Sequence, residues 1–470
     1  MFFTLAKTIV HTAAGFFVKD FYMLRVLHFN DVYNMERGAS TFAHFIKHKQ
    51  QNHICLFSGD AFSPSIVSPK SKGMHMVDLF NHIGVHAATP GNHEFDDGIN
   101  NARKAFLASK FPWVSSNLRL KKNKRSIPGT VSNYFIRNND IRIGFVGIAE
   151  KDWLNTIKDG VHMEVVDASD IIRETRDKCD VLIALTHMSL PNDIKFAGQY
   201  PEVDLIFGGH DHEVIVHKNI IKSGTDFENF SEVCYDVKDK RVTDYTVCDT
   251  STWTSKDVEV EAMVSRHMAT VSQESDNDVI FVSPKDMDAT TRVVRSVRGT
   301  HTVVQYACER VWRALGKPLD CFVMLNGGTF RANRVYKKDH PFTEVDMRGL
   351  MPWDVPLYVT QISGRSIKEI VRVSDEGVLQ GMFHGRFMHY NANLDVSSLD
   401  DDTLYFVVTT DFLATGGDGY GDLFGENVSP IGFSIQDALR GKMYGAFKPD
   451  ALIAAGTTSG DVTSPDDLFS

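Results

Sequence analysis

Residues 205–212 read LIFGGHDH, in which a short apolar run leads through two glycines to two histidines. An apolar run of this length is typical of a buried strand. In an extended chain the side chains of His210 and His212, two residues apart, point to the same side. Open α/β sheets hold their ligands at the carboxyl ends of such strands. The stretch therefore predicts an α/β fold with imidazole donors at the end of a buried strand.

Four earlier apolar runs end in the same way, each with a residue that can bind a metal ion. The runs cover residues 24–29, 54–57, 85–88 and 181–185. The residues that follow them are Asp31, Asp60, Asn92 with His93, and His187. Each aspartate taken alone is more often a helix cap or a turn residue, but together the motifs indicate one shared site. Its oxygen and nitrogen donors, without a thiolate, suit two divalent metal ions such as zinc or manganese.

Composition and charge narrow the class of protein. The chain has 470 residues, 43% of them hydrophobic, which is enough for two domains or more. The net charge of -10 argues against general binding to nucleic acid or to anionic membranes. Six cysteines without a CxxC pair favour buried reduced thiols over a disulfide framework.

Targeting signals are weak. No run of about 18 uninterrupted apolar residues is present, so no membrane anchor is expected. The first 18 residues are fairly apolar, but Lys7 and His11 interrupt them. A secretory signal and a true start at Met23 both stay open, and we expect a cytoplasmic protein. The oligomeric state is left open.

The pattern of elements divides the chain into two α/β parts. In the first part short apolar strands alternate with amphipathic segments, such as 39–49 and 169–178. A stretch without Gly or Pro, 256–273, then reads as a linker helix that ends in a polar run. A helical pattern at 302–315 and a strand at 321–325 open the second part. We expect a metal-binding domain, a linker helix with a hinge, and a substrate-binding domain over residues 24–255, 256–278 and 279–470.

These motifs resemble the calcineurin-like metallophosphoesterase superfamily and, within it, the two-domain 5′-nucleotidase family. The matching motifs of the first half are LHFND (27–31), SGD (58–60), GNHEFD (91–96), LTH (185–187) and GGHDH (208–212). In the second half NGGTFR (326–331) resembles the family's phosphate-binding block. The block that holds the base is matched by DFLA (411–414) and GGDGY (416–420). The resemblance implies a four-layer αββα metallophosphoesterase domain followed by a smaller α/β C-terminal domain.

The resemblance also implies a role for each matching residue of the first half. Asp60 would bridge two metal ions about 3.5 Å apart, which would make hydroxide available near neutral pH. The other ligands would be Asp31 and His212 for the first ion, and Asn92, His187 and His210 for the second. His93, oriented by Asp96, would donate a hydrogen bond or a proton toward the transition state and the leaving group.

Four residues of the second half are expected to bind the substrate. Arg331 is the candidate phosphate clamp, because a guanidinium reaches two phosphate oxygens at once. Asn326 belongs to the same block. Tyr420 and Trp353 are expected to cover the two faces of the base, with ordinary core packing as the alternative role of Trp353.

One position departs from the family pattern. The family usually has a histidine two residues after its first aspartate, and this chain has Tyr33 there. A phenol is a poor ligand unless it loses its proton, which only a strongly acidic ion such as ferric iron makes easy. We therefore expect Tyr33 to line the first site, and that site to bind its ion more weakly.

The sequence as a whole predicts a metal-dependent hydrolase acting on a nucleotide substrate, in the first place a 5′-nucleotidase that releases nucleoside and phosphate. A nucleotide-sugar diphosphatase or a 2′,3′-cyclic-nucleotide phosphodiesterase would use the same metals. A catalytically silent nucleotide- or metal-binding protein is the alternative of another class. The intact pair of His93 and Asp96 argues against this last alternative.

Overall fold

A computed structural model describes residues 22–49, 53–155, 157–271, 278–319, 321–379, 387–391, 394–425, 427–444, 447–449 and 452–453. The chain divides after Val271 into two compact units. The apolar N-terminal segment 1–18 and most of the predicted hinge lie outside the described residues. Among the described residues, no helix combines the length and the apolar character needed to cross a membrane.

The first unit contains two sheets. One has the strand order β15-β14-β1-β2-β3-β4-β6, and the other has the order β12-β13-β11-β10-β8-β7. The strands of the first sheet are β1 (Met23–Phe29), β2 (Ile54–Ser58), β3 (Ala87–Thr89), β4 (Trp113–Val114), β6 (Thr130–Val131), β14 (Asn229–Asp236) and β15 (Arg241–Asp249). Those of the second are β7 (Asn133–Asn138), β8 (Ile141–Ala149), β10 (Val181–His187), β11 (Leu205–Gly208), β12 (Val214–His217) and β13 (Ile220–Ser223). The central strands of both sheets are parallel, so their carboxyl ends face one edge of each sheet.

The side chains of these strands alternate between two cores, as a period of two residues requires. In β1, Leu24 and Val26 point into a core shared with the second sheet, whereas Leu27 and Phe29 pack against helices. In β10 the even and odd positions divide in the same way, with Ile183 in the core between the sheets and Leu182 under helices. The central strands, such as β2 and β10, are mostly apolar because both of their faces are buried.

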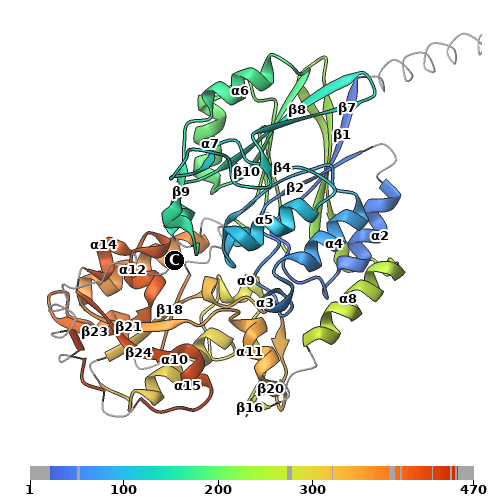
Figure 1. Ribbon diagram of the computed structural model, residues 1–470. Coiled ribbons are helices and arrows are strands. Elements are labelled where there is room, and N and C mark those ends of the chain that lie inside the picture. Colours follow the sequence, from blue (N-terminus) through green and yellow to red (C-terminus); the bar gives the residue numbers. More distant parts are fainter. Residues whose placement is uncertain are drawn as a thin grey trace, which may run out of the picture. The chain divides into compact units, whose positions relative to one another are not determined.

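Helices cover the outer face of each sheet (Figure 1). The first sheet carries α2 (Ala39–Lys49), α4 (Met74–Ile83), α5 (Ile99–Ala108) and α8 (Val258–Val271). The second carries α6 (Ser169–Arg176) and α7 (Leu190–Gln199). The order helix, sheet, sheet, helix confirms the predicted four-layer αββα architecture. Helix α8, predicted as a linker, packs on the first unit through buried Val260 and Met263.

The second unit is a three-layer α/β/α structure. Its main sheet has the order β22-β18-β23-β21-β24. These strands are β18 (Cys321–Asn326), β21 (Pro356–Ser363), β22 (Met388–Tyr390), β23 (Leu404–Thr410) and β24 (Val428–Ser434). One face packs against α10 (Val303–Ala314), α11 (Glu344–Leu350) and α15 (Ile435–Leu439), and the other against α12 (Gly364–Leu379) and α14 (Gly421–Phe424). Two small two-stranded sheets join β16 (Val279–Val282) to β20 (Pro341–Thr343) and β17 (Met287–Asp288) to β19 (Val335–Tyr336).

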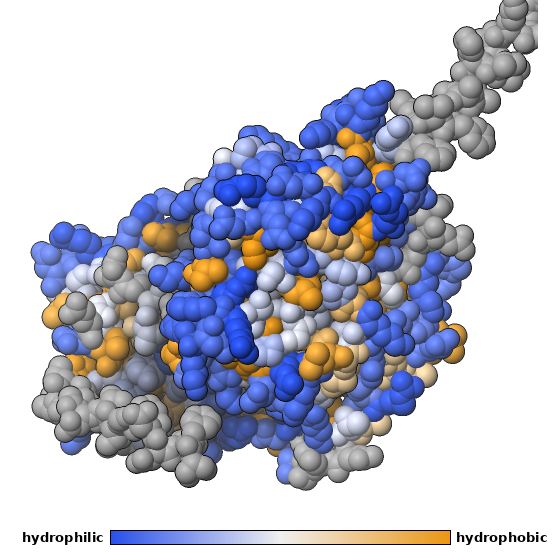
Figure 2. All heavy atoms as spheres, turned by 45° about the horizontal axis from the view of Figure 1, so that its top comes forward, coloured by the Kyte–Doolittle hydropathy of each residue, from blue (hydrophilic) through white to orange (hydrophobic). Residues whose placement is uncertain are grey.

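Surface composition agrees with the charge of the chain. Figure 2 shows a face on which hydrophilic residues predominate and hydrophobic residues are scattered. The most exposed large hydrophobic side chains come from elements spread along the sequence, such as Val161, Val258 and Leu319. Single exposed apolar side chains are normal on a surface that faces water. All six cysteines are unpaired, as the sequence predicted.

Candidate metal and catalytic site

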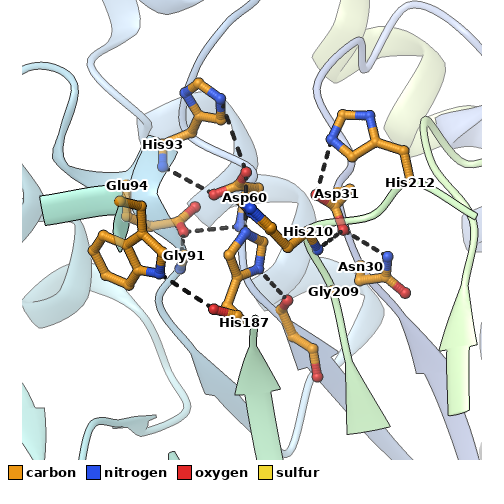
Figure 3. A network of polar contacts seen from close by, with 12 residues as sticks. Asn30, Asp31, Asp60, Gly91, His93, Glu94, His187, Gly209, His210 and His212 are labelled. Carbon is orange, nitrogen blue, oxygen red and sulfur yellow. Dashed lines mark hydrogen bonds and ion pairs between the residues drawn. The ribbon is translucent and has the colours of Figure 1, made fainter. Parts of the chain in front are cut away.

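The six residues predicted as metal ligands lie together at the carboxyl ends of strands from both sheets of the first unit. Figure 3 shows the side chains of Asp31, Asp60, His187, His210 and His212 converging on one region. Asp31 and Asp60 follow β1 and β2, and Asn92 follows β3 in a short 3-10 turn. His187 is the last residue of β10, and His210 and His212 follow β11. The site therefore forms where the two parallel sheets end.

Two buried carboxylates form the centre of the site. Asp31 Oδ1 lies 3.1 Å from Nε2 of His212, and Asp60 Oδ2 lies 3.2 Å from Nε2 of His187. Donor atoms of Asp31, Asp60 and His187 all lie within 4.8 Å of one another. Burial raises the pKa of Asp31, but the neighbouring His212 outweighs this effect and the pKa falls to about 2. Both carboxylates are thus negative at neutral pH and close enough to share a cation.

Several of these residues adopt an unusual backbone conformation. Asp31, Asp60, His210 and His212 have φ values of 53°, 68°, 81° and 62°. Residues other than glycine rarely adopt this left-handed backbone conformation, and each one that does costs about 1–3 kcal/mol of folding free energy. Strain of this kind is concentrated at functional sites, where the surrounding structure holds it in place.

Glycines make room for the donor atoms. A Cβ atom added to Gly91 would lie 2.2 Å from Asp60 Oδ1 and 2.8 Å from the His187 ring. A Cβ atom added to Gly209 would lie 2.3 Å from the Ser58 carbonyl oxygen and 2.7 Å from Nδ1 of His187. Any side chain at either position would displace a donor, so the glycines of the GNHEFD and GGHDH motifs are required by packing.

Two buried polar atoms of the site have no hydrogen-bond partner within the described part of the chain, Asn92 Oδ1 and His187 Nε2. The other ring nitrogen of His187, Nδ1, donates to the Ser58 carbonyl at 2.9 Å. Nε2 faces Asp60 Oδ2 at 3.2 Å. Burial lowers the pKa of His187, but the negative charge of Asp60 outweighs this effect and raises it to about 10, so a metal ion would displace the proton on Nε2. Buried polar groups are almost always satisfied, and a cation among these donors would satisfy both atoms. The residues present therefore fit divalent metal ions.

His93 and Asp96 form the predicted pair. Nδ1 of His93 donates to Asp96 Oδ2 at 2.7 Å, and Nε2 lies 3.9 Å from Asp60 Oδ2. The backbone N–H of His93 also donates to Asp60 Oδ1 at 2.9 Å. The imidazole is consequently fixed with Nε2 toward the carboxylates, while Asp96 holds its outer edge.

Glu94 supports the site in a way that the sequence analysis did not predict. Its buried carboxylate accepts backbone N–H groups from Asp60, Ala61, Phe62 and Gly91, at 2.6 to 3.2 Å. Burial raises the pKa of Glu94 to about 7, and the charge of Asp60 adds to the rise. Glu94 lies inside the GNHEFD motif, but nothing in the motif shows that it binds the loop after β2.

Lys222 is a second support that no local sequence signal indicated. This buried lysine on β13 forms ion pairs with Asp193, at 2.7 Å, and with Asp211. It also donates to the Gly209 carbonyl at 2.9 Å. Burial lowers the pKa of Lys222, but the two carboxylates outweigh this and raise it. The charged amine thereby holds the loop that carries His210 and His212.

Glu150 orients His210. It follows β8, and its Oε1 lies 3.3 Å from Nε2 of His210. Its Oε2 accepts hydrogen bonds from Ser189 and Asn192. Partners so distant in sequence give no local pattern, so this contact too was missed. His28, in contrast, is a core histidine between the Ser58 and Ser223 hydroxyls.

The Tyr33 hydroxyl lies among the residues predicted for the first ion. Its Oη is 3.2 Å from Asp31 Oδ1, 3.1 Å from Asp60 Oδ2 and 2.8 Å from Nε2 of His212. The side chain is only 4% exposed. The phenol therefore takes part in the site itself.

In the second unit, Asn326 joins the two predicted substrate-binding blocks. Its Nδ2 donates to Asp418 Oδ2 at 2.8 Å, and its Oδ1 accepts from Thr329 at 2.6 Å. The Arg331 guanidinium lies 5.7 Å from the centre of the Trp353 ring. Nε of Arg331 is buried without a hydrogen-bond partner among the described residues. Trp353 as a whole residue is 37% exposed, so it is accessible to a ligand in part.

Tyr420 is placed differently from what a stacking role requires. Its ring is 1% exposed and packs in the core beside Phe424. Phe412 of the same block is only partly buried, and its ring lies over Gly417, where a Cβ atom would come within 2.5 Å of it. Burial raises the pKa of Asp411, with a further contribution from Asp354. Asp411 and Asp354, the chain neighbours of Phe412 and Trp353, are therefore close enough to interact electrostatically.

Comparison with known proteins accounts for both units. Residues 24–214 match the calcineurin-like phosphoesterase family, and residues 289–426 match the 5′-nucleotidase C-terminal domain. The chain belongs to the two-domain 5′-nucleotidase family. The solved structure of a 5′-nucleotidase precursor from Thermus thermophilus has the same fold as this chain, with a TM-score of 0.70 and 18% sequence identity. That alignment covers 89% of this chain and 96% of the other.

Two curated relatives show how far the similarity in sequence extends. The trifunctional nucleotide phosphoesterase protein YfkN of Bacillus subtilis is 23% identical, over 91% of this chain and 35% of its own length. The snake venom 5′-nucleotidase of Naja atra is 30% identical, over 38% of this chain and 36% of its own length. The chain thus spans about a third of the length of these two relatives.

Proposed function

We propose that the protein is a metal-dependent phosphomonoesterase that acts on nucleotides, in the first place a 5′-nucleotidase that releases nucleoside and phosphate. The observation that carries the proposal is the cluster of Asp31, Asp60 and His187, with donor atoms within 4.8 Å of one another. Asn92 Oδ1, which is buried and has no hydrogen-bond partner among the described residues, also supports a bound cation. Membership of the 5′-nucleotidase family supports the substrate class.

The donor set divides into two positions that share Asp60. Asp31 and His212 would hold the first ion, and Asn92, His187 and His210 the second. When bound, divalent ions would supply Lewis-acid activation of water and of the phosphoryl group. Glu150 and Lys222 would keep the loop of His210 and His212 in position, because both contact it directly or through Asp211.

His93 is the proposed general acid. Because Nδ1 donates to Asp96, the other nitrogen faces the carboxylates and can donate to a transition-state oxygen or to the leaving group. The Asp96 carboxylate favours the charged imidazole, which strengthens such a hydrogen bond. A protein without turnover would gain nothing from this pair.

The second unit would supply recognition of the nucleotide. Arg331 can hold two oxygens of a phosphate. Trp353 is partly exposed, and we propose that its ring stacks on the base together with that of Phe412, which takes the place first expected for Tyr420. Stacking of a base on an aromatic ring contributes roughly 1–3 kcal/mol.

A second candidate activity uses the same centre. The relative named as a trifunctional nucleotide phosphoesterase favours testing more than one class of phosphoester. Nucleotide-sugar diphosphatase or 2′,3′-cyclic-nucleotide phosphodiesterase activity would need the same ions and a different fit of the leaving group.

A release assay with purified protein tests the proposal. The protein, stripped with a chelator, is incubated with zinc, manganese, magnesium or cobalt and with nucleoside mono-, di- and cyclic phosphates or nucleotide sugars. We expect phosphate from nucleoside 5′-monophosphates, loss of activity with chelator, and recovery with metal. Asp60→Asn is the inactive control. The absence of any product from every nucleotide with every metal would refute the proposal.

A further inference from the structure

We propose that Lys222 is a positioning residue that holds His187 and His210 at a fixed spacing, and that it thereby controls the affinity of the second metal position. The inference rests on the proposed function only in requiring that the site bind divalent ions. It goes beyond the support of one loop, because it assigns to a single buried charge the spacing of two ligands from different strands. Lys222 itself would not be a ligand, since an ammonium group has no lone pair.

The ammonium group contacts the ends of the two strands that carry these histidines. Nζ of Lys222 donates to the Met188 carbonyl at 2.6 Å and to the Gly209 carbonyl at 2.9 Å. Met188 directly follows His187, the last residue of β10, and Gly209 directly precedes His210, after the end of β11. The two strands are parallel neighbours in the second sheet. One ammonium group therefore joins both strand ends at the point where each presents its imidazole.

Two carboxylates extend this contact to the opposite side of each histidine. Asp211, the residue after His210, forms an ion pair with the ammonium group. Asp193 lies 2.7 Å from the same nitrogen and accepts the Thr186 hydroxyl at 2.6 Å. Thr186 is the residue before His187. The ammonium group thus contacts, directly or through one carboxylate, the residues on both sides of both imidazoles.

Burial fixes the position of the ammonium group. The side chain of Lys222 is 1% exposed and that of Asp193 is 0% exposed. A charge at such depth must keep its acceptors, so it holds both strand ends in place. The rings of His187 and His210 have their centres 5.2 Å apart. Two imidazoles bound to one tetrahedral ion, through nitrogen atoms about 2.0–2.1 Å from it, have ring centres roughly 5 Å apart. The spacing held by Lys222 therefore suits two ligands of one ion.

The first position depends less on Lys222. Of its two proposed ligands, His212 adjoins Asp211, a partner of the ammonium group, on one side only. Asp31 follows β1 in the other sheet and accepts the Asn30 amide at 2.6 Å. Loss of a group that orients metal ligands typically lowers metal affinity about 10–100-fold. A change at Lys222 should consequently weaken the second position much more than the first.

Metal binding in variants that keep one position tests the inference without substrate. His212→Ala removes a ligand of the first position, and His210→Ala removes one of the second. Zinc affinity is measured by titration calorimetry, and the visible spectrum of bound cobalt reports its ligands. Adding Lys222→Met to His212→Ala should lower affinity at least about tenfold and alter the cobalt spectrum. Adding it to His210→Ala should lower affinity less than about threefold. Lys195→Met, at an exposed lysine of α7, is the control and should change neither.

The outcomes separate this inference from the proposed function. Equal changes of affinity in the two backgrounds, or none in either, overturn the role of Lys222 even if nucleotides are hydrolysed. A loss confined to the second position, in a protein that hydrolyses no nucleotide, supports that role and refutes the proposed function. If circular dichroism shows that Lys222→Met does not fold, the same comparison with Asp193→Asn decides, because this smaller change removes one charge that holds the ammonium group.

Discussion

His93 contacts the centre of the site through hydrogen bonds, and its side chain is held by Asp96. If the imidazole acts on the transition state, His93→Ala should lower kcat by roughly 10²-fold or more, the usual scale for a positioned acid. Bound metal, measured by elemental analysis, should stay near the wild-type amount. His48→Ala, on the exposed face of α2, is the matched control. Unchanged kcat would remove His93 from the mechanism, and loss of metal would make it a ligand.

Lys222 shows the cost of a buried charge. Replacement by methionine leaves Asp193 and Asp211 without their amine, so Lys222→Met should lower the free energy of unfolding by about 3–5 kcal/mol. Lys178→Met is the control, because it removes an exposed pair with Glu174 and should cost less than about 1 kcal/mol. Urea unfolding of the metal-free chain gives both values. Equally small losses of unfolding free energy in the two variants would show that the ion pairs of Lys222 with Asp193 and Asp211 contribute little to stability.

The sequence could predict the role of a residue only where that role depends on the neighbouring residues in the chain. Asp31, Asp60 and His187 each follow an apolar run, and that rule alone placed them together. The contacts of Lys222 and Glu150 join segments far apart in sequence, so no spacing could indicate them. Tyr420 shared a glycine-rich block with the expected ligand contacts, but tertiary packing turned its ring into the core.

At the scale of the element, the ends of the strands carry the site and the glycines set how closely those ends approach. Gly91→Ala should displace Asp60 or His187, since a Cβ atom there would lie 2.2 Å from Asp60 Oδ1. We expect at least a tenfold loss of metal affinity, measured by titration calorimetry, with an unchanged circular dichroism spectrum. Gly198→Ala in α7 is the control, because nothing lies within 4 Å of the added atom. Equal affinities in the two variants would contradict this account.

The elements themselves were largely predictable from apolar periodicity. The runs at 24–29, 54–57 and 205–207 correspond to β1, β2 and β11 within one or two residues. The run at 85–88 is shifted, since β3 covers Ala87–Thr89. Short strands buried on both faces show no alternation that would fix their ends. The helix predicted as a linker formed as expected, but its packing against the first unit depends on α2 and α4, which sequence pattern could not show.

At the scale of the whole molecule, the proposed functions fall on different units. The proposed metal ligands come from the first unit and the proposed base contacts from the second. Trp353→Ala should therefore raise KM for a nucleoside monophosphate roughly tenfold, within the range of base stacking. KM for a small aryl phosphate, which has no base, should change much less. Parallel losses on both substrates would instead indicate ordinary core packing for Trp353.

Acid should weaken the fold through neutral buried histidines. Burial lowers the pKa of His389 from 6.5 to about 4, although its hydrogen bond to the Val294 carbonyl acts in the opposite direction. The unfolded chain therefore binds a proton below pH 6.5 that the folded chain binds only near pH 4, so stability falls as pH falls through this window. From pH 7 to pH 5, the low pKa of His389 should lower the free energy of unfolding by about 2 kcal/mol.

His389→Gln tests this estimate. The variant lacks the titrating group, so the gap in unfolding free energy between it and the wild type should narrow by about 2 kcal/mol from pH 7 to pH 5. Urea unfolding at the two pH values measures the gap. His48→Gln is the matched control and should leave a constant difference. A gap for His389→Gln that does not change with pH would show that His389 is not neutral in the folded chain.

The left-handed backbone at Asp31, Asp60, His210 and His212 has a consequence for directed evolution. Each position would be relaxed by glycine, and each strained residue costs about 1–3 kcal/mol. A library selected for heat resistance alone would accordingly accumulate glycine at the four proposed metal-binding positions. Selection for thermal stability would favour glycine at these four positions, whereas selection for turnover would favour the present residues.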